Sequence, residues 1–163
     1  MTDSCTVLMV FPLFNAGSFW NYTEACELSG ARYPAAPLGL LTVAALLPPH
    51  WTVSLVNRNT ETLEDADFDR ADLIMTGGML PQRNDTLHLI ERCRKAGKPV
   101  VVGGPDVTSS PALYAAANFQ VLGEAEEIMA DFIAAWRRGD RQGVVEAPMG
   151  KTDVTKSPLP RFD

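Results

Sequence analysis

Short apolar runs alternate with longer segments of helical periodicity along most of the chain. Most of these runs are continuously hydrophobic rather than alternating, which is typical of parallel strands covered on both faces. The runs that predict strands are CTVLMVF (5–11), TVSLVN (52–57), DLIMT (72–76), PVVVG (99–103) and FQVL (119–122).

The segments between these runs predict helices. They are LGLLTVAALL (38–47), DTLHLIERCRKAG (85–97), a short turn from Ser110 through Tyr114, and EAEEIMADFIAAWRRG (124–139). The first is apolar on nearly all sides, so we expect it to be well buried. Strands that alternate with helices indicate βαβ units, and hence a three-layer α/β fold with a doubly wound parallel sheet of five strands.

Two segments break this alternation. Residues 12–37 are rich in turn residues and aromatics, and a connection of this length is usually functional or disordered. Residues 141–163 have neither helical nor strand periodicity and read as a linker. We therefore expect one domain over residues 1–140, with a long aromatic loop at 12–37 and a linker at 141–163.

Composition narrows the class of protein. With 163 residues, 46% hydrophobic and 21% charged, the chain suits a single globular domain, and its net charge of −6 disfavours a nucleic-acid surface. No apolar run reaches the roughly 18–20 residues of a membrane span, and the N-terminus lacks the basic region of a signal peptide. The three cysteines suggest neither a disulfide framework nor a metal site, so we expect a cytoplasmic protein.

The predicted carboxyl edge of the sheet is rich in glycine. Ligands of open α/β sheets bind beyond this edge, and glycine permits positive φ and close backbone approach. Three of the five predicted strands end in glycine, which favours a large ligand site over simple turns. The candidate site residues are Phe14, Asn15, Asn57, Arg58, Thr76, Gly77, Gly78, Met79, Gly103, Gly104, Pro105, Thr108, Gly123 and Glu124.

Several of these residues have an alternative interpretation. Thr108 either donates a hydrogen bond to a ligand or caps a helix. Arg58 either approaches a ligand or simply caps a strand end. Glu124 contacts a ligand's amides or ribose, or only complements the helix dipole. The aromatic residues of 12–37 cover a ligand, contact a partner or form a satellite hydrophobic cluster.

Familiar catalytic and phosphate-binding motifs are absent. The sequence has no GxGxxG after the first predicted strand, no GxxxxGK[ST], and no Ser/His/Asp or Cys/His nucleophilic set. The site therefore favours holding a large ligand over catalysis by this chain alone. A nucleotide-binding Rossmann-like module and a ligand-free docking domain of the same fold remain alternatives.

Six sequence blocks in order resemble the N-terminal cobalamin (vitamin B12)-binding domain of radical-SAM enzymes. They are PxxPLGLLTVAALLP (34–48), LVNRNTETL (55–63), ADLIMTGGMLPQ (71–82), GKPVVVGGPDVTSSP (97–111), LGEAEE (122–127) and SPLPRFD (157–163). The chain is most similar to the branch that contains hopanoid-methylating enzymes.

This resemblance implies a flavodoxin-like fold with the corrin ring across the carboxyl edge of the sheet. The cobalamin tail would then lie among the loops after strands one, three, four and five, where the glycines give it clearance. The resemblance also implies a methyltransferase in which the corrinoid carries the methyl group. A radical-SAM barrel, with its S-adenosylmethionine and [4Fe-4S] cluster, would follow Asp163, so the present chain would not be catalytic alone.

Two family motifs are missing. Residues 11–17 lack the DxHxxG motif whose histidine binds cobalt in the best-known cobalamin domains, and such an absence is common in the radical-SAM branch. His50 is predicted at the opposite edge of the sheet and His88 on a helix surface, so we identify no protein ligand for cobalt. The CxxxCxxC cluster motif is also absent, as expected if the barrel lies beyond this chain.

Overall fold

The computed structural model describes residues 4–33, 36–148, 150 and 152–163. Its centre is a parallel sheet with the strand order β2-β1-β3-β4-β5-β6. The strands are β1 (Thr6–Phe11), β2 (Thr52–Asn57), β3 (Leu73–Gly77), β4 (Val100–Gly103), β5 (Phe119–Leu122) and β6 (Gly143–Glu146). The parallel, doubly wound α/β fold is confirmed.

The predicted number of strands is wrong by one. β6 pairs in parallel with β5, from Phe119 opposite Gly143 to Leu122 opposite Glu146. The sheet thus reaches Glu146, beyond the expected domain end at residue 140. The strand was missed because β6 lies at the sheet edge with mostly exposed residues, so it lacks the continuous apolar run of a buried strand.

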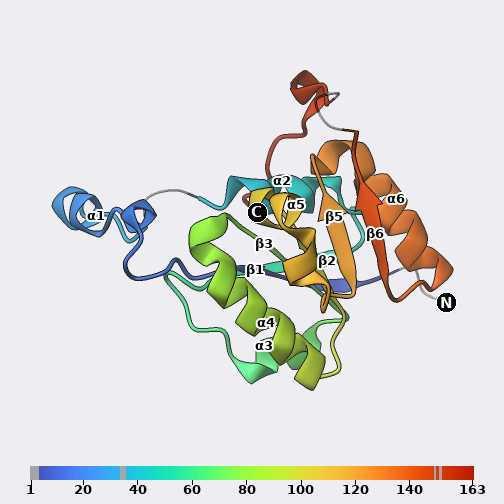
Figure 1. The fold of residues 1–163 in the computed structure, drawn as a ribbon, viewed down its shortest axis with the longest axis horizontal. Coiled ribbons are helices and arrows are strands. Elements are labelled where there is room, and N and C mark those ends of the chain that lie inside the picture. Colours follow the sequence, from blue (N-terminus) through green and yellow to red (C-terminus); the bar gives the residue numbers. More distant parts are fainter. Residues whose placement is uncertain (1–3, 34–35, 149, 151) are drawn as a thin grey trace.

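Helices cover both faces of the sheet, giving three layers (Figure 1). One face carries α2 (Leu38–Leu46) and α6 (Ala125–Arg138), and the other carries α3 (Asp65–Arg70), α4 (Arg83–Lys95) and α5 (Pro105–Ser109). Side chains of β1 alternate between these layers: Val7 and Met9 face α2 and α6, while Leu8 and Val10 face the other side.

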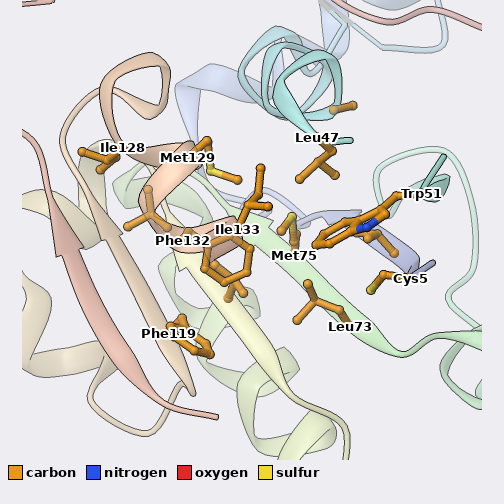
Figure 2. Close-up of a cluster of buried hydrophobic side chains, with 14 of the residues drawn as sticks. Cys5, Leu47, Trp51, Leu73, Met75, Phe119, Ile128, Met129, Phe132 and Ile133 are labelled. Atoms are coloured by element: carbon orange, nitrogen blue, oxygen red, sulfur yellow. The ribbon is translucent and has the colours of Figure 1, made fainter. Parts of the chain in front are cut away.

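The core beneath α2 and α6 is densely apolar. Figure 2 shows Phe132, Ile133 and Met129 of α6 above the sheet, with Trp51 and Met75 beside them. The rings of Phe119 and Phe132 meet edge to face at a centroid distance of 5.2 Å. This packing fixes α6 over β3, β4 and β5.

The helix α2 is less buried than its sequence predicts. Only Ala44, 3% exposed, is buried within its bounds, whereas Leu38 is 54% exposed. Part of its apolar surface faces a cavity instead of the core, as described below. The apolar residues on most sides of α2 therefore serve two surfaces, one packed on the core and one facing the cavity.

Residues 15–33, which we call the arm, stand apart from the sheet. The arm contains a 3-10 turn at Phe19–Asn21 and the helix α1 (Thr23–Ser29), so part of the expected long loop is regular. Figure 1 shows α1 well outside the three layers. Phe19, Trp20 and Leu28 are exposed on it.

The last seven residues, 157–163, return to the body of the domain, and we call them the strap. The Ser157 hydroxyl donates to Glu126 Oε1 of α6 at 2.6 Å, and the Arg161 amide donates to the Leu41 carbonyl of α2 at 3.1 Å. The strap therefore links α2 and α6. Across the described residues, none of the helices combines the length and hydropathy that crossing a bilayer requires.

Candidate functional site

A cavity of about 600 Å³ lies between α2 and the carboxyl ends of the central strands. That volume falls within the usual range for small-molecule sites. The strand order reverses between β1 and β3, because β2 pairs on one side of β1 while β3 to β6 follow on its other side. The cavity therefore occupies the position where open α/β sheets bind their ligands.

The deepest part of the lining, which we call the floor, is apolar. It consists of Met75, Val101 and Val121 from three adjacent strands and Met129 from α6. All four also belong to the core under α2 and α6. The adjoining wall is formed by α2 through Leu40, Thr42 and Val43.

Five glycines border the floor, and we call them the glycine rim: Gly77, Gly78, Gly103, Gly104 and Gly123. A Cβ on Gly77 would overlap the carbonyl oxygen of Gly103 on the next strand. Gly104 has φ +94°, and a Cβ there would lie 3.2 Å from the Gly78 amide nitrogen. At these two positions, neighbouring backbone already occupies the space that a Cβ would need.

The structure brings most of the predicted site residues together. Ten of the fourteen line the cavity: Phe14, Thr76, Gly77, Gly78, Met79, Gly103, Gly104, Pro105, Gly123 and Glu124. The other four, Asn15, Asn57, Arg58 and Thr108, are outside its lining.

These four residues have structural contacts instead. Asn57 Oδ1 accepts the Asn59 amide at 3.0 Å, and Arg58 forms an ion pair with Asp85. Thr108 Oγ1 accepts the amide of Gly123 at 3.0 Å and so supports the glycine rim from behind. The Asn15 side chain accepts the Gly17 amide at 3.2 Å within the arm.

Gln82 is a cavity residue that the sequence analysis missed. It is 1% exposed, its Nε2 donates to the Pro12 carbonyl at 2.7 Å, and its Oε1 accepts the Met79 amide at 3.0 Å. It therefore ties the loop after β1 to the loop after β3. The sequence gave no clear signal, because a glutamine in a loop after a strand is usually expected at the surface.

A second missed feature is a polar network behind the glycine rim. Arg83 at the start of α4 donates through Nε and Nη2 to both carboxyl oxygens of Asp106 in α5, at 2.8 and 2.6 Å. The Tyr114 hydroxyl donates to the same carboxylate, and the Asp106 amide donates to the Gly78 carbonyl at 3.3 Å. The network joins the loops after β3 and β4.

The charges of this network are fixed by their contacts. Hydrogen bonds from Arg83, and secondarily from Tyr114, lower the pKa of the Asp106 carboxyl below its ordinary value despite its burial. Burial, helped by the neighbouring carboxylate, raises the pKa of Tyr114 to about 12. Asp106 is therefore an ionised acceptor and Tyr114 a neutral donor at neutral pH.

The two histidines lie where the sequence predicts. His88 is exposed on α4, and His50 precedes β2 at the amino edge of the sheet. Neither lines the cavity. The side of the cavity next to β1 is aromatic instead, with Phe11, Phe14 and Tyr33 in mutual ring contact at centroid distances of 5.9 to 6.2 Å.

Comparisons with known proteins agree with this arrangement. Residues 28–133 match the model of the B12 binding domain. An uncharacterised methyltransferase of Synechocystis sp. is 40% identical over 158 residues, covering 96% of this chain and 29% of that protein. A hopanoid C-2 methylase of Rhodopseudomonas palustris is 30% identical over 163 residues, covering 96% of this chain and 30% of that protein. The chain thus spans less than a third of the length of these relatives.

Proposed function

The chain belongs to the B12-binding domain family, and from that premise we propose that it is the cobalamin-binding module of a radical-SAM methyltransferase. The observation that carries the proposal is the cavity at the carboxyl edge of the sheet, with its apolar floor and glycine rim. Bound cobalamin would supply the transfer of a methyl group, and the domain would supply position and shielding.

The residues of the cavity fit such a cofactor. Its floor suits an apolar group, while the glycine rim carries no side chains of its own, so its backbone borders the cavity and can meet polar groups. Phe11 and Phe14 present an aromatic surface next to β1, and Glu124 adds a carboxylate to the rim. Gln82 and Asp106 would hold the surrounding loops in place.

The remaining parts of the enzyme would lie outside this chain. The relatives are more than three times as long as the matched region. We infer that residues from about 147 onward lead to a radical-SAM barrel that binds S-adenosylmethionine and a [4Fe-4S] cluster. The substrate and the reaction belong to that longer protein.

An absorbance titration of the 163-residue chain with hydroxocobalamin, followed by desalting, tests the proposal. We expect one cobalamin to stay with the protein. Thr42→Trp should weaken this retention at least tenfold, because Thr42 is partly buried in the cavity wall and an indole there would fill the space. Thr52→Trp is the matched control, since Thr52 is exposed on β2 outside the cavity.

The outcomes separate the alternatives. Retention by the wild type and by Thr52→Trp, with loss in Thr42→Trp, supports the site. Equal retention by all three chains would place cobalamin elsewhere. If the folded chain retains none, and a longer chain with the following domain also retains none, the cobalamin proposal is overturned; saturable binding of a nucleotide would then favour the Rossmann-like alternative.

A further inference from the structure

The strap joins the two helices that border the cavity. The Ser157 hydroxyl donates to Glu126 Oε1 of α6 at 2.6 Å, and the Arg161 amide donates to the Leu41 carbonyl of α2 at 3.1 Å. Glu126 itself lines the cavity, and α2 lines it through the residues on either side of Leu41. Both attachment points of the strap therefore lie at the cavity rather than at a remote surface.

The strap is held to the body by modest contacts. Its two large apolar side chains, Leu159 and Phe162, are exposed, so they add little buried area to its docking. Pro158 and Pro160 are partly buried, and because proline fixes the backbone torsion φ, they reduce the freedom that the strap loses when it docks. Docking through two hydrogen bonds and partly buried prolines is modest in strength, so a change in the cavity can shift it.

The helix α2 is the wall of the cavity that the strap holds in place. Within its bounds only Ala44, toward its C-terminal end, is buried, while residues of its N-terminal half border the cavity. By contrast, α6 is anchored in the core through Ile128, Met129, Phe132 and Ile133. The hydrogen bond to Leu41 therefore ties the less anchored wall of the cavity to the better anchored one.

Glu126 provides a second link between the strap and a ligand. A carboxyl group has two oxygens, so Glu126 can accept the Ser157 hydroxyl through one and a donor in the cavity through the other. A side chain that Ser157 already orients loses less rotamer freedom when a ligand binds. The strap and a ligand that donates hydrogen bonds, such as the amides of a corrinoid, thus favour the same orientation of Glu126.

We propose that the strap is a clasp, such that its docking and the binding of a ligand in the cavity favour each other. This inference rests on the proposed cobalamin function and adds how the same site is regulated. Ser157 is a positioning residue, because it acts on the ligand through Glu126. Since residues from about 147 onward would lead to the next domain, the clasp would report to that domain whether the cavity is filled.

Absorbance titrations of the 163-residue chain with hydroxocobalamin test the inference through matched variants. Ser157→Ala removes the hydroxyl and should weaken binding at least about fivefold, because the docked strap no longer stabilises the bound state. Ser157→Thr keeps a hydroxyl and should bind nearly as tightly as the wild type. Thr155→Ala is the control: the Thr155 hydroxyl donates to Asp153 Oδ1 at 2.6 Å on the surface before the strap, so its loss should leave the affinity unchanged.

The docking of the strap gives a second readout that does not depend on the titration. Hydrogen exchange of the Arg161 amide, followed by NMR, measures how often the strap leaves α2. Hydroxocobalamin should slow this exchange by the same factor by which removal of the strap, in a chain that ends at Lys156, weakens binding, because coupling between two sites is reciprocal. In the free chain, Ser157→Ala should speed the exchange severalfold.

Each outcome decides the inference. If Ser157→Ala and the chain that ends at Lys156 bind as tightly as the wild type, or if hydroxocobalamin leaves the Arg161 exchange rate unchanged, the clasp is overturned while cobalamin binding stands. Tighter binding by Ser157→Ala would also overturn it, because the strap would then compete with the ligand for Glu126. If neither the wild-type chain nor a longer one binds hydroxocobalamin, the cobalamin function itself fails, and the clasp with it.

Discussion

At the residue scale, Asp106 holds together two loops that the sequence keeps far apart. Its carboxylate accepts three hydrogen bonds from Arg83 and Tyr114, and its backbone amide reaches the Gly78 carbonyl. The Asp106 side chain is 4% exposed and the Arg83 side chain 29%, so the carboxylate is buried while solvent screens the ion pair in part. The glycine rim is consequently supported by a charge that must remain ionised.

Asp106→Asn should therefore destabilise the protein in a pH-dependent manner. The pKa of Asp106 is lowered in the folded protein, so its contribution is present above the unfolded pKa of about 4 and is lost as the pH falls through the lowered value. We expect a loss of about 2–3 kcal/mol in the free energy of unfolding at pH 7, shrinking steadily below pH 4. Urea unfolding at pH 3, 5 and 7 measures this difference.

Asp140→Asn serves as the control for charge removal. Asp140 pairs with Arg138 on the surface, with both side chains well exposed, so its loss should change stability little at any pH. If Asp106→Asn behaves like Asp140→Asn at pH 7, the buried network does not stabilise the fold.

Residues in this region show what the sequence could and could not predict. The double glycine was correctly identified as the end of a strand, because a valine run followed by glycines is a local pattern. The reason for it required the fold, since the atoms that exclude a Cβ belong to neighbouring strands and loops. Arg83 and Asp106 were missed for the same reason: they are 23 positions apart and meet only across two loops.

At the element scale, hydrophobic patterns predicted the strands and the long helices and missed elements that are short or have few apolar residues. The five predicted strands, β1 to β5, agree with the structure to within one residue at each end. The helices α3 and α5, of 6 and 5 residues, are too brief to show a helical repeat. β6 was missed because it has only four residues, most of them exposed, and so shows no run of buried apolar residues.

The role of β6 can be tested by shortening the chain. A chain that ends at Asp140 lacks β6, leaving the fully buried strand β5 without a partner on one side and removing the Ala147 amide bond to the Leu122 carbonyl. We expect its Tm to fall by roughly 5–10 °C, and the exposed edge to promote aggregation. Differential scanning calorimetry and light scattering would follow both effects.

A chain that ends at Lys156 is the matched comparison. It keeps β6 and loses only the strap, so its Tm should lie much nearer to that of the full chain. If the chain ending at Asp140 is as stable as the one ending at Lys156, β6 does not stabilise the fold, and the domain ends at residue 140 as the sequence predicts.

At the scale of the whole molecule, a three-layer body carries an arm whose contacts with that body are few. The body has an apolar layer on each side of the sheet, whereas the arm buries little besides Cys26. Three arm residues, Trp20, Tyr22 and Tyr33, nevertheless line the cavity. A ligand in the cavity would therefore touch both parts and hold the arm against the body.

This coupling predicts a ligand-dependent change in proteolysis. Chymotrypsin should first cut the free chain near Phe19, Trp20 and Tyr22, which are 80%, 48% and 41% exposed. Aromatic residues of the body such as Phe132 and Tyr114 are buried and should resist cleavage. Hydroxocobalamin should slow cutting of the arm at least about threefold, because bound ligand restricts the open conformations that a protease needs. Mass spectrometry of timed digests would locate and time the cuts.

Thr42→Trp makes this experiment specific to the cavity. With the cavity filled, the ligand should no longer protect the arm, while the rate of cutting without ligand should match that of the wild type. Protection that persists in Thr42→Trp would mean that hydroxocobalamin acts on the protease or binds elsewhere. Absence of protection in a wild-type chain that demonstrably retains cobalamin would mean that the arm remains free of the bound ligand, and that its aromatic residues face a different partner.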